Sequence, residues 1–155
     1  MILILNIEDL PPMPRNRSHM LTVSGKRPMN IKTPLCREFE KTLEGILQAY
    51  LPPMEKFKSA FVPKKHFISA EFFIYAPKEV ILTQEQVISS RCPDFDSNKA
   101  LTDVIFKVLQ MDDKLIKSAT IKYLISPSNN WDHIIILRLE NLETLYLPTS
   151  SLELL

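Results

Sequence analysis

Glycine and cysteine are scarce in this sequence, and each shortage excludes a class of site. Two glycines occur among 155 residues, and neither a GxGxxG nor a GxxxxGK[ST] pattern is present, so the phosphate-cradling loops of nucleotide-binding proteins are missing. The two cysteines, Cys36 and Cys92, form no CxxC pair. This argues against a structural zinc site and is typical of a protein in a reducing compartment.

Long hydrophobic runs are absent as well. The opening run MILILNI is too short for the hydrophobic part of a signal peptide, and it leads directly into EDLPP. No stretch approaches the roughly 20 apolar residues that a membrane-spanning helix needs. We therefore expect a cytoplasmic protein that has no membrane partner.

The charge of the chain is balanced in sum but not in distribution. Apolar residues make up 45% of the chain and charged residues 24%, with a formal net charge of +1, which is an ordinary composition for one globular domain. Between Pro14 and Lys32 there is no acidic residue, and the basic residues there are Arg15, Arg17, Lys26, Arg27 and Lys32. A basic segment apart from an acidic one suits a polyphosphate surface beside a metal site, although solvated loops explain it equally well.

Hydrophobic periodicity predicts six regular elements. It favours strands over 1–7, 66–75, 116–125 and 133–140, and helices over 34–50 and 100–109. Thr33 is placed to cap the first helix, with Pro34 at its first position, and we expect the pair Pro52-Pro53 to end it.

The segments between these elements complete the expected fold. Residues 13–33 resemble an irregular basic loop, and 77–92 a connection with one helical stretch near Thr83. The last two strands are expected to pair through the loop SPSNNW. The order β-α-β-(α)-α-β-β predicts a single α+β domain over 1–140, with helices packed on a mixed sheet, followed by a tail over 141–155 without an assigned role.

The segment RCPDFDSNKALTDVIFKVLQMDD, residues 91–113, gathers negative charge around the second helix. Its aspartates are Asp94, Asp96, Asp103, Asp112 and Asp113, and carboxylates that lie close together repel one another. At about 100° per residue, Lys99, Asp103 and Lys107 share the polar face of the helix with Asp96. A chain that folds back after the helix would return the Asp112-Asp113 turn toward Asp94 and Asp96.

Two interpretations of this segment remain open on the residues alone. Two or three carboxylates suffice to hold Mg²⁺, which takes oxygen ligands and keeps several waters, and a nearby lysine would steady a phosphate. Alternatively, Asp96 caps the helix, Asp103 and Lys107 form a surface pair, and Asp112-Asp113 is a polar turn.

The whole run PDFDSNKALTDVIFKVLQMDD resembles the signature of the RusA family of Holliday-junction resolvases, and LPPMPRNRSH resembles the start of that family. The resemblance covers roughly residues 2–140, and it is specific only over 93–117. It implies a RusA-like nuclease domain whose catalytic, metal-binding aspartates are Asp94, Asp96 and Asp113. It also implies that Lys99 is the family's lysine, that Asp103 is its helical aspartate, and that Asp112 has a supporting place in the turn.

Two departures from the family pattern concern the same segment. The spacing between Asp96 and Lys99 is one residue shorter than in the family, so that either Ser97 or Asn98 stands for the family's asparagine. Leu115 takes the place of a glutamine that usually follows the turn.

The resemblance implies a small homodimer, often encoded by phages, that nicks four-way DNA junctions symmetrically with Mg²⁺ or, as a substitute, Mn²⁺. Arg15, Arg17, Lys26, Arg27 and Lys32 would then hold DNA through its phosphates. A related nuclease for flaps or forks, and a DNA-binding protein of the same fold that does not cleave, are the alternatives.

Overall fold

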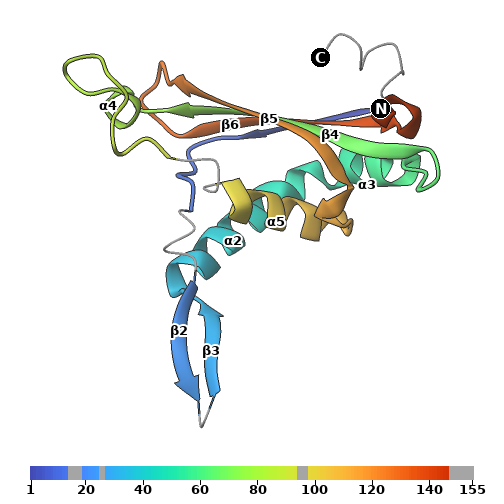
Figure 1. Cartoon of the computed structure of the whole chain (residues 1–155), viewed down its shortest axis with the longest axis horizontal. Helices are drawn as coiled ribbons and strands as arrows, with labels where there is room; N and C mark the ends of the chain where they lie inside the picture. The colour runs from blue at the N-terminus through green and yellow to red at the C-terminus, as the bar shows by residue number, and fades with distance from the viewer. Residues whose placement is uncertain (14–18, 25–26, 94–97, 147–155) are drawn as a thin grey trace.

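The computed structural model describes residues 1–13, 19–24, 27–93 and 98–146. It shows a single α+β domain in which one mixed sheet carries a layer of helices (Figure 1). The sheet has the order β1-β6-β4-β5, formed by β1 (Ile2–Ile7), β4 (His66–Ala76), β5 (Ile116–Ile125) and β6 (Asp132–Asn141). β6 is antiparallel to both β1 and β4, whereas β5 is parallel to β4.

The main helices lie together on one face of this sheet (Figure 1). They are α2 (Pro34–Leu47), α3 (Leu51–Ala60) and α5 (Lys99–Leu109). One hydrophobic core joins them to alternate residues of the strands, among them Leu5, Phe72 and Leu137, with Leu43 of α2 and Ile105 of α5. Burial of such side chains contributes roughly 1.5–3 kcal/mol each. No helix among the described residues is both long and apolar enough to cross a membrane.

The start of α2 is confirmed. The hydroxyl of Thr33 accepts a hydrogen bond from the backbone N–H of Cys36, at 3.2 Å, and Pro34 occupies the first helical position. α2 ends at Leu47 and is followed by a 3-10 turn, η1 (Gln48–Tyr50).

We predicted that the pair Pro52-Pro53 ends the helix, but helical structure continues through these prolines. The prolines lie in the first turn of α3, where a missing N–H breaks no helical hydrogen bond. Met54 and Phe57 of this helix are buried in the core.

Within the segment 13–33, the described residues 19–24 and 27–32 are not the irregular loop that we predicted. They form two antiparallel strands, β2 (His19–Ser24) and β3 (Arg27–Lys32), in a hairpin separate from the main sheet. Pro28 lies in β3, and a proline is tolerated there because each strand of a hairpin has one unpaired edge.

The last two strands have nearly the predicted bounds but not the predicted pairing. β5 and β6 are not neighbours, because β4 lies between them. Physical character explains the order: β5 exposes Lys117, Ser118 and Thr120, as an edge strand does. β6 carries the apolar run 134–137, which suits an interior strand.

Two smaller predictions also need correction. The apolar run 1–7 predicts a strand buried on both faces, but β1 is an edge strand with Ile2 and Ile4 exposed, so only alternate residues of it are buried. The helical stretch of the 77–92 connection, α4 (Lys78–Ile81), precedes Thr83 instead of starting near it. Past the strand β6, the structure describes a 3-10 helix, η4 (Leu142–Leu145), while 147–155 lies outside the described residues.

Candidate functional site

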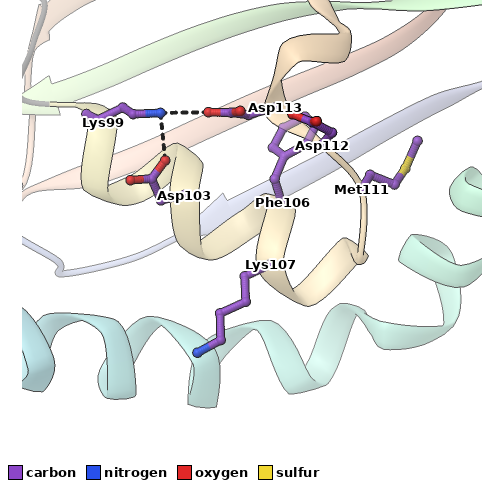
Figure 2. Close-up of a pocket in the computed structure, with 7 residues that line it drawn as sticks. All are labelled: Lys99, Asp103, Phe106, Lys107, Met111, Asp112 and Asp113. Carbon is purple, nitrogen blue, oxygen red and sulfur yellow. Dashed lines mark hydrogen bonds and ion pairs between the residues drawn. The ribbon is translucent and has the colours of Figure 1, made fainter.

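Lys99, Asp103 and Asp113 meet at one cationic group. Lys99 is the first residue of α5, and its Nζ lies 2.8 Å from Oδ1 of Asp103, one turn further along the helix. The same Nζ lies 2.6 Å from Oδ2 of Asp113, which comes after the helix (Figure 2). The chain therefore folds back after α5 and returns the carboxylate of Asp113 toward the start of the helix.

The backbone at the end of α5 produces this reversal. Gln110 adopts the left-handed conformation at φ 55°, ψ 45°, and the N–H of Met111 donates to the carbonyl of Phe106 at 3.1 Å. A left-handed residue followed by such a bond is a common way to end a helix sharply. Asp112 then accepts from the N–H of Lys114 at 2.9 Å and caps the short 3-10 helix η3 (Asp113–Leu115).

Hydrogen bonds within this cluster favour the charged forms of Lys99 and Asp113. Hydrogen bonds to Asp103 and then to Asp113 raise the pKa of Lys99. The hydrogen bond from Lys99 is likewise the main reason that the pKa of Asp113 is lowered. These side chains remain partly exposed to solvent, at 57% for Lys99 and 33% for Asp113, so a ligand from solution reaches them.

An open hollow lies beside the three charged groups (Figure 2). Its volume is about 360 Å³, and its lining consists of Lys99, Asp103, Phe106, Lys107, Met111, Asp112 and Asp113. The lining thus combines three acidic residues and two lysines with Phe106 and Met111.

Lys107 does not form the surface pair with Asp103 that the sequence suggested, and pairs with Glu44 instead. Its Nζ lies 2.7 Å from Oε1 of Glu44 in α2, and it points away from Asp113 (Figure 2). Asp103 lies between Lys99 and Lys107 in the helix, and it pairs with Lys99. The pair between Lys107 and Glu44 instead connects the two helices.

Asn98 directly precedes Lys99, and its burial was not predicted from the sequence. It occupies the N-cap position of α5, where Asp96 was considered, and it is only 4% exposed. Among the described residues, neither its Oδ1 nor its Nδ2 has a hydrogen-bond partner. A buried amide without hydrogen bonds costs about 1–3 kcal/mol. The amide of Asn98 is therefore able to form further hydrogen bonds. No sequence pattern signals its burial.

Several predicted site residues lie outside the part of the chain that the structure describes. These are Asp94, Asp96, Arg15, Arg17 and Lys26. Within residues 1–13, 19–24, 27–93 and 98–146, no group of three or more His, Cys, Asp or Glu is arranged to hold a metal ion. Of the remaining basic candidates, Arg27 begins β3, and Lys32 forms an ion pair with Glu40 of α2.

Comparison with known proteins adds no assignment to this geometry. No model of a protein family matches the chain, and no curated protein matches it.

Proposed function

We propose that the chain is a Mg²⁺-dependent, structure-selective endodeoxyribonuclease that resolves four-way DNA junctions in recombination and repair. The observation that carries the proposal is the ammonium group of Lys99, held between the carboxylates of Asp103 and Asp113. Asp113 and Lys99 are 14 residues apart in the sequence, yet their side chains are in contact. Both are residues for which the resemblance to the RusA family implies a role in catalysis.

The donor set fits a hard divalent cation. Carboxylate oxygens are the ligands that Mg²⁺ prefers, and the carboxylate of Asp113 already pairs with the positive charge of Lys99. In the proposed site Asp113 would hold the ion together with Asp94 and Asp96, and Mn²⁺ would be able to replace it. When bound, the ion supplies a Lewis acid that neutralises charge on the scissile phosphate.

The residues of the chain then divide the remaining work. Lys99, once Asp113 turns to the cation, is free to donate a hydrogen bond to a phosphate oxygen and stabilise charge that develops there. Asp103 stays within one helical turn of Lys99 and keeps that ammonium group oriented. Arg15, Arg17, Lys26 and Arg27 add phosphate contacts away from the scissile bond.

The proposal includes a homodimer. Resolution of a junction needs two paired nicks, and a two-fold symmetric protein presents two equal sites to a substrate that is itself nearly two-fold symmetric. A single copy of the site would leave a nicked junction unresolved.

A substrate panel tests the proposal. The purified protein is incubated with labelled four-way junction, flap, fork and duplex DNA, with Mg²⁺, with Mn²⁺ and with EDTA. We expect paired, ligatable nicks in the junction, with either metal and not with EDTA. Preferred cleavage of flaps or forks would identify the related nuclease instead, and binding without cleavage of any substrate would identify a non-cleaving DNA-binding protein.

A further inference from the structure

The β2–β3 hairpin extends away from the sheet beyond the helix layer (Figure 1). Its strands pair with each other from His19↔Lys32 to Ser24↔Arg27, and neither joins the main sheet. At its base, β3 leads through Thr33 into α2, and Lys32 forms an ion pair with Glu40 of that helix. The hairpin is therefore an arm whose base is attached to a rigid helix.

Large apolar side chains are exposed along this arm. Leu21 is 80% exposed, Met20 44% and Met29 46%. The register places Leu21 opposite Asn30, and Met29 opposite Thr22 on the other face of the ribbon, so apolar side chains project from both faces. An isolated two-stranded hairpin is only marginally stable in water, and exposed apolar patches mark sites of interaction. The arm has the character of an element that inserts into a partner.

The positive charge of the arm and of the adjoining sequence indicates a negatively charged partner. The sequence from Pro14 to Lys32 has five basic residues and no acidic one. A second copy of the same arm would bring like charges together, which is unfavourable, whereas a polyanion is attracted. Nucleic acid is the polyanion whose grooves admit a two-stranded ribbon and whose stacked bases accept an apolar side chain.

We propose that the hairpin is a wedge, in which Leu21 inserts between stacked base pairs at the branch of the DNA and separates them. The proposal rests on the DNA-binding part of the proposed function and adds a residue that acts on base stacking, not on phosphate. Leucine and methionine are among the side chains that proteins use for such insertion, at a cost of a few kcal/mol per unstacked step. A branch point lowers that cost, because stacking is already interrupted there.

The test measures binding and unstacking separately on one substrate. A four-way junction carries 2-aminopurine next to its centre, and a second junction carries a dye for anisotropy; both are titrated in EDTA, which prevents cleavage. We expect the wild-type protein to raise 2-aminopurine fluorescence on binding. Leu21→Ser should lose most of that increase while its dissociation constant changes by less than about threefold, since phosphate contacts dominate affinity.

Two further variants fix the interpretation. Leu21→Met keeps an apolar side chain and should retain the fluorescence increase. Leu145→Ser alters another exposed leucine, 47% exposed in η4, and should behave as wild type. Circular dichroism checks that each variant is folded, and because Leu21 is so exposed in the arm, its replacement should leave the domain intact.

The outcomes separate this inference from the function on which it rests. If wild-type protein binds no branched DNA, the proposed function fails and the wedge with it. If it binds and Leu21→Ser gives the wild-type fluorescence increase, the wedge is overturned and the function stands. If Leu21→Ser instead changes the sedimentation of the protein without DNA, the arm belongs to an interface between copies of the chain, and the wedge is likewise overturned.

Discussion

A single lysine connects both ends of the charged helix. Lys99 reaches forward one turn to Asp103 and across the reversed chain to Asp113, at 2.8 and 2.6 Å. An ammonium group is compact and sits on a flexible stem, so it fills the place between two carboxylates as a small cation does. In the proposed site the lysine and the metal ion therefore compete for the carboxylate of Asp113.

This competition predicts the effect of Lys99→Met on metal affinity. The substitution keeps the length of the side chain and removes its charge, so Asp113 is freed for the cation. Because exposed ion pairs are worth about 0.2–1 kcal/mol, we expect Mn²⁺ or Mg²⁺ to bind up to about fivefold more tightly, measured by calorimetry. Lys107→Met is the matched control, because it removes an ammonium group that pairs with Glu44 instead. Equal affinities for the two variants would contradict the competition.

Asp103 is expected to orient Lys99 and not to bind the ion. Asp103 lies one turn along α5 from Lys99 and pairs with its ammonium group, whereas the proposed ligands of the ion are Asp94, Asp96 and Asp113. Asp103→Asn should therefore slow cleavage and leave the Mg²⁺ concentration dependence of the rate little changed. Since Asp103 and Asp113 touch the same ammonium group, a loss of Mg²⁺ binding in Asp103→Asn as large as in Asp113→Asn would make Asp103 a ligand.

Some contacts between these residues are predictable from their spacing in the sequence, and others are not. The pair between Lys99 and Asp103 follows from a separation of four residues on one helix. The contact of Lys107 with Glu44 depends on how α2 packs against α5, and no local pattern encodes that packing. The burial of Asn98 is likewise not signalled by any local pattern.

At the scale of elements, the chain that leaves β1 is tied to the start of β6. The N–H of Asp9 donates to the carboxylate of Asp132 at 2.9 Å, and the N–H of Leu10 donates to the carbonyl of Trp131 at 2.8 Å. Nε2 of His133 bonds to the carbonyl of Leu10 at 2.7 Å, and the imidazole is only 1% exposed. These hydrogen bonds hold Asp9 and Leu10, which precede the basic segment, against the start of β6.

The burial of His133 makes this tie sensitive to acid. Burial lowers the pKa of His133 below its ordinary value of 6.5, and within the described part of the chain Nδ1 has no hydrogen-bond partner that would accept from it if it were protonated. Below pH 6.5 the unfolded chain therefore binds more protons than the folded one, and the free energy of unfolding falls as the pH falls. One such group contributes at most about 1.4 kcal/mol per pH unit.

His133→Gln tests this dependence. The variant should be less stable than wild type at pH 8, because the imidazole contact is lost. The difference in unfolding free energy, from urea denaturation, should shrink as the pH is lowered to 5.5, since the variant lacks the titrating group. A difference that stays constant across this range would show that His133 does not cause the acid sensitivity.

The elements themselves were partly predictable. β5 and the start of α2 follow from alternation and from the cap at Thr33. The start of α3 at the proline pair was missed, because proline is as compatible with a first turn as with a helix end. The hairpin was missed because Gly25 and Pro28 resemble loop punctuation, whereas Pro28 occupies an unpaired edge.

At the scale of the whole molecule, the α+β class and the mixed sheet follow from the pattern of elements, but the strand order does not. Periodicity shows that a segment is a strand and which face of it is apolar; it does not name its neighbours. The insertion of β4 between β5 and β6 depends on the crossover through α5. The same crossover ends at the reversed turn that returns Asp113 to Lys99, so the sheet topology and the proposed site share one cause.

The measurement that tests the central claim most directly is cleavage of a four-way junction by Asp113→Asn. Asparagine keeps the shape of the side chain and removes the charge that would hold the cation. Under single-turnover conditions with Mg²⁺, we expect this variant to bind the junction as tightly as wild type and not to cleave it. Glu143→Gln, which changes an exposed carboxylate in η4, should cleave at the wild-type rate. An Asp113→Asn protein that cleaves the junction as fast as wild type would contradict the account.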